Sequence, residues 1–268
     1  MTILVTGATG NIGRKVVDEL VGRGVTDIRA LTTNPAKAAL PSGVHAFSGF
    51  IGKPETLDGA FEGVTAMYLA PYEPTAAEVL RRAKAAGVQY VVALSGGAHW
   101  QALADEVFAA GLDVTQLGPG EFLENFAGWA GQVADGVVRE PYPDAGGAPI
   151  AMADIAAVAA ALLAAEDRGP HVGRMYDLTG PEFLTRVDAV ARIAEGIGRE
   201  VRFEQISREE AEAALTAQMG DMAGWYLDLQ DASRWYRQEA NSLVEELSGR
   251  PATGLAQWAS EHRAVFGA

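Results

Sequence analysis

The chain has 268 residues, 49% of them hydrophobic, which is enough for one large α/β domain or for such a domain with a small lobe attached. Its formal net charge of −14 disfavours nucleic acid and anionic membrane surfaces as partners, because both are negatively charged themselves. Cysteine is absent, which excludes disulfides and thiolate nucleophiles, and the four histidines show no metal-ligand spacing, so no metal is expected.

A glycine-rich turn opens the chain, in the segment Ile3-Leu-Val-Thr-Gly-Ala-Thr-Gly-Asn-Ile-Gly13. An apolar run leads into it and an amphipathic run, 14–24, follows it, so the pattern predicts a strand, a tight turn and a helix. Gly7 lets the backbone turn sharply, Gly10 leaves room for a diphosphate, and Gly13 lets the helix pack close to the strand. The helix would offer free N–H groups and the positive end of its dipole to phosphates. The turn therefore predicts dinucleotide binding, with a plain connecting turn as the alternative.

Strand and helix signals alternate through the first two thirds of the chain. Short apolar runs, typical of strands covered on both faces, lie at 3–6, 27–32, 44–48, 66–70, 90–95 and 114–117. Helical segments lie at 14–23, 55–61, 76–86, 101–110 and 155–165. This repetition predicts an α/β fold with a Rossmann-type, doubly wound parallel sheet, whose ligand crevice lies at the C-terminal ends of the strands.

The remaining third is mainly helical and rich in large aromatic side chains. We expect a strand at 176–179, a helix at 185–196, a strand at 201–206, and helical structure from 209 to 266 that begins with a cap at Ser207. The expected domains are a dinucleotide-binding Rossmann domain at 1–150, continuing through the helix and strand of 151–180, and a small, mainly helical C-terminal lobe at 181–268 that covers the substrate.

Several segments together resemble the atypical short-chain dehydrogenase/reductase superfamily, and most of all its NmrA-like and HSCARG-like branch, which includes NAD(P)H:quinone reductases and triphenylmethane reductase. The segments are the glycine turn, 29–35, 91–95, 117–122 with Asn125, 153–156, 178–182 and 247–251. The resemblance covers nearly the whole chain. It implies the fold and NAD(P) binding, but it does not imply one particular activity or substrate.

The residues expected to contact the cofactor lie in the glycine turn and at the ends of the next three strands: Gly7, Thr9, Gly10, Asn11, Ile12, Gly13, Thr32, Thr33, Lys37, Phe50, Ala70 and Pro71. Proteins of this branch often carry an arginine, which holds the 2′-phosphate of NADP, where Thr33 stands. The acidic residue that would hold the ribose of NAD is also absent. Thr33, Asn34 and Lys37 can still bind a phosphate, so NADP (NADPH) is favoured over NAD. The branch usually has aspartate where Phe50 stands, and Phe50 either stacks on adenine or plugs the pocket.

No Tyr-x-x-x-Lys pair occurs in the chain. That pair supplies the proton donor of common short-chain dehydrogenases, so its absence weakens an alcohol dehydrogenase interpretation without excluding hydride transfer. The candidate catalytic residues are His99 and Ser95, which follow the fifth strand, and Tyr72, which follows the fourth. His99 is chosen because an imidazole titrates near neutral pH. Each has a structural alternative, as a loop, strand-end or packing residue.

An apolar, aromatic-lined substrate pocket is predicted from a further group of side chains, with core packing as the alternative. These side chains are Trp100, Phe122, Asn125, Phe126, Trp129 and Trp225. The leading hypothesis is therefore an NAD(P)H-dependent reductase, an oxidoreductase acting on a small, flat, apolar conjugated molecule such as a quinone, an enone or a polycyclic aromatic metabolite.

Two other classes of function remain open. One is an NAD(P)-binding regulatory or sensor protein without turnover. The other is a cofactor-independent isomerase, cyclase or dehydratase on a degenerate reductase scaffold. Since the first strand begins by residue 3 and no apolar run is long enough to span a bilayer, we expect neither signal peptide nor membrane span, and a cytoplasmic protein. A homodimer is left open.

Overall fold

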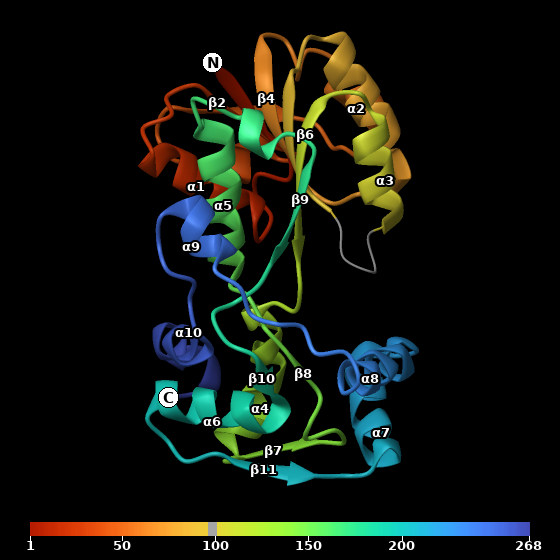
Figure 1. Ribbon diagram of the computed structural model, residues 1–268, viewed down its shortest axis with the longest axis vertical. Helices are drawn as coiled ribbons and strands as arrows, with labels where there is room; N and C mark the ends of the chain where they lie inside the picture. The colour runs from red at the N-terminus through yellow and green to blue at the C-terminus, as the bar shows by residue number, and fades with distance from the viewer. Residues whose placement is uncertain (96–100) are drawn as a thin grey trace. The chain divides into compact units, whose positions relative to one another are not determined.

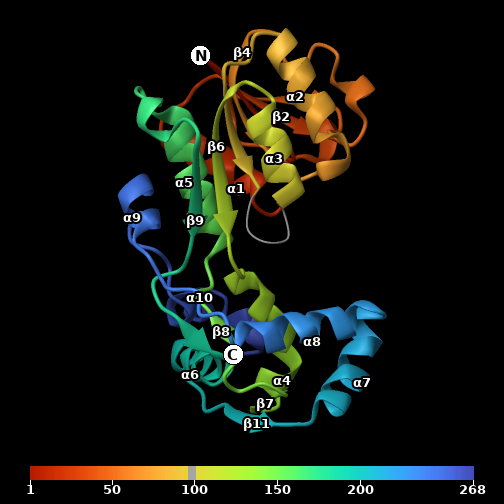
Figure 2. The same ribbon diagram turned by 45° about the vertical axis from the view of Figure 1, so that its right-hand side comes forward.

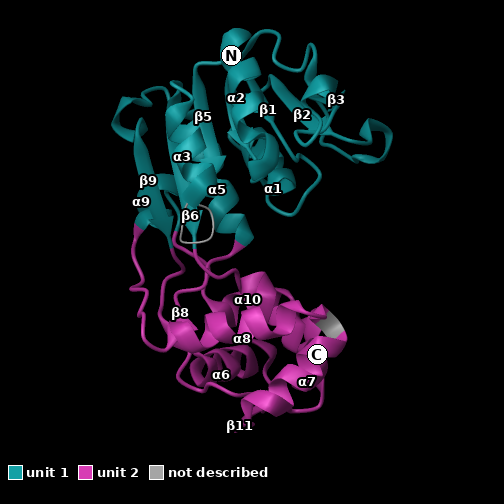
Figure 3. Cartoon of the chain, turned by 90° about the vertical axis from the view of Figure 1, so that its right-hand side faces the viewer, with its two compact units in different colours: residues 1–119, 152–178, 243–250 teal, residues 120–151, 179–242, 251–268 magenta. Residues whose placement is uncertain are grey.

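The computed structural model describes residues 1–95 and 101–268, except for the side chain of Gln218. These residues form two compact units that are interleaved along the chain (Figure 3). Unit 1 comprises Met1–Pro119, Met152–Leu178 and Leu243–Arg250, and unit 2 comprises Gly120–Ala151, Thr179–Ser242 and Pro251–Ala268. Residues 120–151, which the sequence assigned to the dinucleotide-binding domain, therefore belong to unit 2 by their contacts.

Unit 1 contains the predicted parallel sheet, with seven strands in the order β3-β2-β1-β4-β5-β6-β9 and every neighbouring pair parallel (Figure 1). The strands are β1 (Thr2–Val5), β2 (Ile28–Thr32), β3 (Val44–Ser48), β4 (Val64–Leu69), β5 (Tyr90–Leu94), β6 (Asp113–Pro119) and β9 (Arg174–Leu178). Because β1 lies between β2 and β4, the strand order reverses at the glycine turn, where such folds bind their ligands. The predicted Rossmann-type fold is confirmed.

Five helices cover the sheet of unit 1. They are α1 (Gly13–Gly22), α2 (Ala76–Ala85), α3 (Gln101–Ala109), α5 (Met152–Ala164) and α9 (Leu243–Ser248). Helix α5 packs against α1 and α9 on one face, and α2 packs against α3 on the other (Figures 1 and 2). The alanine-rich α5 is buried along most of its length, as its apolar sequence predicts, and its small side chains allow α1 to approach closely.

The helix predicted at 55–61 is wrong. The structure has one 3₁₀ turn at Pro54–Leu57, followed by an irregular segment. Gly59 and Gly63 have φ angles of +80° and +70°, in the left-handed region that an α-helix cannot include, so the apolar spacing there serves a turn.

Unit 2 contains short strands and helices around a second hydrophobic core. Its elements are η4 (Leu123–Trp129), α4 (Ala130–Ala134), β7 (Val137–Glu140), β8 (Gly146–Gly147), β10 (Leu184–Thr185), α6 (Arg186–Ile197), β11 (Arg202–Gln205), α7 (Arg208–Met219), α8 (Met222–Ser233), α10 (Leu255–Glu261) and η6 (Arg263–Phe266). Helix α6 packs on α10, and a Cβ at Gly196 would lie 2.2 Å from the carbonyl oxygen of Ala256, so glycine is required at this contact. The cap predicted at Ser207 is confirmed, since its side chain and that of Glu210 form a capping box at the start of α7.

Two general findings concern the described residues. None of their helices is long and apolar enough to cross a membrane. Nor do they contain a group of three or more histidine, aspartate or glutamate side chains that could hold a metal ion.

Candidate cofactor-binding site

The glycine turn is shaped by close contacts within unit 1. Gly7 has a φ angle of +60°, which favours glycine, and a Cβ at Gly13 would lie 2.2 Å from the carbonyl oxygen of Gly7. A Cβ at Gly10 would lie 3.2 Å from the same oxygen, which is tight but tolerable. The three glycines therefore have different roles. Gly13 tolerates a side chain least, because it begins α1 in direct contact with the turn.

The first turn of α1 carries neither a capping side chain nor an acidic residue of its own. The N-cap residue Ile12 makes no side-chain hydrogen bond to the helix, and the first turn contains no acidic residue. Thr9, Gly10 and Asn11 are exposed on the turn that leads into the helix. The turn therefore fits a diphosphate, whose charge would be stabilised by the positive end of the helix dipole.

The end of β2 presents hydroxyl groups beside this turn. The Oγ1 atoms of Thr9 and Thr32 lie 3.2 Å apart, and the N–H of Asn34 donates to Thr32 Oγ1 at 3.3 Å. Thr33 and Lys37 are exposed on the segment that follows. This segment ends where the Arg14 guanidinium donates to the Ala39 carbonyl at 2.8 Å. Thr32 is thus brought to the glycine turn, and residues 32–37 contain no carboxylate.

The end of β4 lies against the other side of the turn. The Thr6 hydroxyl donates to the Tyr68 carbonyl at 3.0 Å and accepts from the Ala70 N–H at 2.8 Å, which fixes β4 to β1 at this point. A Cβ at Gly7 would lie 3.1 Å from the Cβ of Ala70. Ala70 therefore borders the turn, and the half-buried Pro71 follows it in the chain.

Phe50 and Tyr72 are in contact, although the sequence analysis gave them separate roles. Their ring centroids lie 5.4 Å apart with an interplanar angle of 64°, an edge-to-face geometry. Phe50 follows β3 and Tyr72 follows β4, and each keeps more than a third of its surface exposed. Only the folding of the two loops brings these rings together, and the catalytic role expected for Tyr72 stays a prediction.

Ser95 is buried at the end of β5 and donates its hydroxyl proton to Gln116 Oε1. The Gln116 amide in turn donates to the Ala104 carbonyl at 2.8 Å. Ser95 thus fastens β5 to its neighbour β6 through a buried hydrogen-bond chain. The other predicted residues of this loop, His99 and Trp100, lie outside the described residues.

The predicted pocket aromatics of unit 2 differ in exposure. Phe126 and Trp129 are only 3% and 6% exposed and belong to the core of the unit. Phe122 is half-buried, whereas Asn125 and Trp225 are exposed. Phe126 and Trp129 are therefore core residues, which was the alternative to a pocket. Only Phe122, Asn125 and Trp225 have surface that a ligand could reach.

A buried charged cluster in unit 2 was missed by the sequence analysis. The Arg186 guanidinium lies under the rings of Phe126 and Trp129 and donates to both carboxylate oxygens of Glu121, at 3.0 and 3.1 Å. Glu140 is 5% exposed and accepts from Trp129 Nε1 at 2.7 Å. Burial raises the pKa of Glu140, although Arg186 and the Trp129 N–H oppose the rise. The residues of this cluster come from three separate stretches of the sequence, 121–129, 140 and 186, so no local pattern predicts the cluster.

The raised pKa of Glu140 predicts a pH dependence of stability. Between the unfolded and folded pKa values the folded chain binds more protons at this carboxyl, so its contribution to stability falls as pH rises through that window. Glu140→Gln keeps an oxygen that can accept from Trp129 and removes the titration. We expect the variant to gain stability relative to the parent protein as pH rises above the ordinary glutamate range, measured by urea unfolding at several pH values. The facing groups Arg186, Glu121 and Tyr226 are unchanged in both proteins, and a difference that is constant with pH would contradict the prediction.

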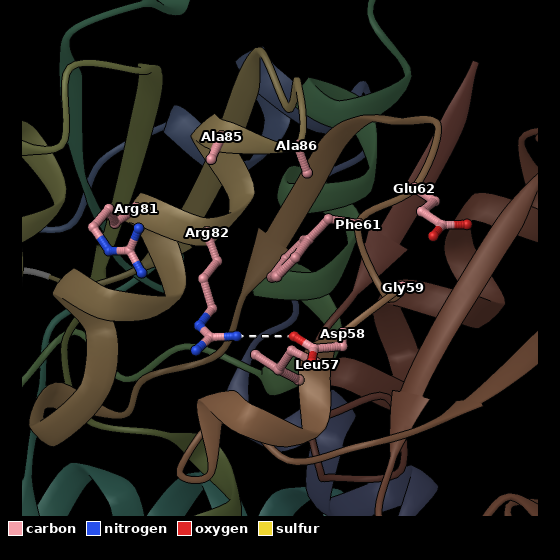
Figure 4. A pocket seen from close by; sticks show the side chains of 9 residues that line it. All are labelled: Leu57, Asp58, Gly59, Phe61, Glu62, Arg81, Arg82, Ala85 and Ala86. Carbon is pink, nitrogen blue, oxygen red and sulfur yellow. Dashed lines mark hydrogen bonds and ion pairs between the residues drawn. The ribbon is translucent and has the colours of Figure 1, made fainter.

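A separate surface pocket of about 410 Å³ lies on unit 1, between α2 and the segment before β4 (Figure 4). Arg82 crosses it to pair with Asp58 at 3.0 Å, and it also pairs with Glu78. The pocket lies near the N-terminal end of β4, whereas the glycine turn follows the C-terminal end of β1. It is therefore no part of the cofactor site.

A doubly wound parallel sheet whose first strand ends in this glycine turn defines a dinucleotide-binding protein. Residues 7–166 match the NAD(P)H-binding family. The chain belongs to that family, and the cofactor class predicted from the sequence is confirmed at this level.

Known proteins resemble the chain along its whole length. A (4-alkanoyl-5-oxo-2,5-dihydrofuran-3-yl)methyl phosphate reductase of Streptomyces griseus is 34% identical, over 98% of this chain and 99% of the relative. The structure of the NADPH-dependent quinone oxidoreductase QOR2 of Escherichia coli in complex with NADPH has a TM-score of 0.82 and 26% identity, covering 98% of this chain and 100% of that one. The triphenylmethane reductase of Citrobacter sp. has a TM-score of 0.84 at 21% identity over 100% of both chains, a likeness of fold. The resemblance stated from the sequence is confirmed.

Proposed function

We propose that this protein is an NADPH-dependent reductase of flat, apolar, conjugated acceptors such as quinones and enones. The observation that carries the proposal is the glycine turn, where Gly13 abuts Gly7 and the N-terminus of α1 has neither a capping side chain nor an acidic neighbour. A diphosphate supplies the negative charge that this end of the helix lacks.

NADPH is preferred over NADH because the end of β2 can accept an additional phosphate. Thr33 and Lys37 are exposed there. Residues 32–37 contain no carboxylate that would repel a 2′-phosphate or accept a hydrogen bond from a free 2′-hydroxyl. The quinone oxidoreductase of Escherichia coli, which resembles this chain over its whole length, was solved with NADPH.

The acceptor class is supported by the relatives and by the absent Tyr-x-x-x-Lys pair. The name of the Streptomyces griseus reductase describes a phosphate ester with a lactone ring whose double bond is conjugated with two carbonyls, and the Escherichia coli relative is named for quinones. When such acceptors take up a hydride, their carbonyl oxygens stabilise the negative charge, so water can deliver the proton without a strong acid in the site. The bound cofactor supplies the hydride, and the chain contributes binding, orientation and exclusion of water.

The proposal is tested by calorimetric titration with NADPH and NADH, followed by a turnover screen with quinones, azo compounds and unsaturated lactones. We expect NADPH to bind more tightly than NADH, and NADPH to be oxidised with at least one acceptor. Gly10→Glu should abolish binding because its carboxylate enters the diphosphate position.

The matched control is Gly22→Glu, which adds the same charge at the exposed end of α1, where no atom lies within 4 Å of the new Cβ. This control should bind NADPH like the parent protein. Binding without turnover over a broad panel would favour a regulatory protein, and no binding of either nucleotide would favour chemistry without the cofactor. Either result would overturn the proposed reductase.

A further inference from the structure

The surface pocket between α2 and the segment before β4 has no role in the proposed reductase. Its volume of about 410 Å³ falls within the range of roughly 300–1,000 Å³ that is usual for small-molecule sites. The end of α2 forms one side of it, and the segment 57–62 forms the other (Figure 4). The pocket is therefore a candidate site for a second ligand, away from the glycine turn.

The side formed by the segment 57–62 is apolar and held in place. Leu57 and Phe61 belong to the hydrophobic core of unit 1, and the Phe61 side chain points toward α2 (Figure 4). The Arg29 guanidinium donates to the carbonyl oxygens of Gly59 and Ala60, at 3.2 and 2.6 Å. These bonds fix the backbone that carries Phe61, so the apolar side of the pocket is already formed before a ligand binds.

The side formed by α2 is cationic. Glu78 accepts three hydrogen bonds of 2.7 Å, two from Arg81 and one from Arg82, and these bonds lower its pKa to about 2. One carboxylate thus orients two guanidinium groups. Arg81 Nη1 and Arg82 Nη2 donate to no acceptor within the described part of the chain. This side therefore has one positive charge in excess and two nitrogen atoms that can donate to a ligand carboxylate.

The rim on the segment 57–62 is anionic. The Asp58 side chain is 85% exposed and pairs with Arg82 through one oxygen, at 3.0 Å, while its other oxygen accepts from no described residue. Glu62 is exposed on the same segment and forms no ion pair with any residue that the structure describes. An exposed ion pair is weak because water competes for both partners. The Asp58 carboxylate can therefore turn from Arg82 to a ligand.

We infer that this pocket binds a zwitterion with an apolar side chain, that is, a free apolar amino acid. The ligand carboxylate binds Arg81 and Arg82. The ammonium group binds Asp58 and Glu62, and the side chain packs on Phe61.

Charge balance favours a zwitterion over a simple ion. A simple anion would displace Asp58 and leave two unpaired carboxylates in a chain of net charge −14. A simple cation would face two guanidinium groups. A zwitterion exchanges one ion pair, between Arg82 and Asp58, for two, and it adds no net charge. The inference goes beyond the proposed reductase and does not depend on it.

Calorimetric titration of the full chain with L-leucine tests the inference, with two analogues for comparison. Isocaproate lacks the ammonium group of leucine, and isopentylamine lacks its carboxylate. We expect leucine to bind and each analogue to bind at least about ten-fold more weakly, because each loses one set of charged contacts. An analogue that binds as tightly as leucine would overturn the inference, and so would the absence of leucine binding at millimolar concentrations.

Two variants test the charged partners separately. Arg82→Gln should weaken leucine binding by about ten-fold or more. Asp58→Asn should also weaken leucine, but it should leave isocaproate no weaker than in the parent protein, because the ammonium partner alone is lost. The matched control is Arg192→Gln, which removes an exposed ion pair of unit 2 and should bind leucine like the parent protein.

All three variants should keep the melting temperature and the NADPH affinity of the parent protein, since the pocket is no part of the cofactor site. Leucine binding that is unchanged in both Arg82→Gln and Asp58→Asn would overturn the inference. That result would leave the proposed reductase intact, because NADPH titration of the parent protein tests it separately.

Discussion

Replacing Gly13 by alanine should weaken NADPH binding strongly. The new Cβ would lie 2.2 Å from the oxygen and 2.7 Å from the carbon of the Gly7 carbonyl, and these backbone atoms cannot rotate away as a side chain could. The turn or the start of α1 must shift, and the N–H donors that face the diphosphate shift with it. Hydrogen bonds to charged groups contribute about 1.5–3 kcal/mol each, so losing two of them weakens binding by about a hundred-fold or more.

The measurement is calorimetric titration of the variant, with Gly22→Ala as its control. Gly22 is the last residue of α1, and a Cβ there meets nothing within 4 Å. Alanine should therefore leave NADPH binding unchanged and stabilise the helix by about 0.5–1 kcal/mol, because glycine loses more conformational freedom on folding. Tight NADPH binding by Gly13→Ala would show that the turn does not hold the diphosphate.

Replacing Arg186 by methionine should destabilise unit 2 by about 3–5 kcal/mol, the usual cost of removing one partner from a buried ion pair. The Arg186 side chain is 7% exposed, and its guanidinium pairs with Glu121. It also packs against Phe126 and Trp129, and its charge opposes the rise in the pKa of the buried Glu140. Methionine fills a similar volume but leaves the charge of Glu121 without its partner.

The matched control lies on the same helix. Arg192 pairs with Glu182 and Glu195, but its side chain is 44% exposed. Arg192→Met should therefore cost at most about 1 kcal/mol, because water replaces the lost partner. Urea unfolding of both variants, followed by tryptophan fluorescence, measures the difference. Equal unfolding midpoints would mean that the cluster around Arg186 contributes no more than a surface ion pair.

The sheet of unit 1 could be predicted because its signals are local. Several strands contain a short apolar run, and the glycine turn combines such a run with a tight turn within eleven residues, 3–13. The candidate cofactor residues of that turn and of the ends of β2 and β4 follow from the same logic, since parallel strands bring their C-terminal ends to one edge.

Contacts between loops could not be predicted in this way. The meeting of Phe50 and Tyr72 depends on how two loops bend, which no periodicity records. The two-residue strand β8 is too short to show an alternating pattern. Arg186 and Glu121 form their ion pair across a separation of 65 residues. Phe126 and Trp129 have the same spacing whether they line a pocket or fill a core, so only the structure distinguishes the two.

The interleaving of the two units has a consequence for how the chain is made. Helix α9, at Leu243–Ser248, is part of unit 1, and Arg250 pairs with Glu19 of α1 and donates to the Ala153 carbonyl of α5. During synthesis the nucleotide-binding sheet therefore leaves the ribosome long before its last helix does. Most of unit 2 must be translated in between. A nascent chain that stops before residue 243 lacks α9 of unit 1 and also lacks Leu255, Trp258 and Phe266 of the unit 2 core. Truncation before residue 243 should therefore destabilise both units, whereas truncation after residue 250 keeps every residue of unit 1.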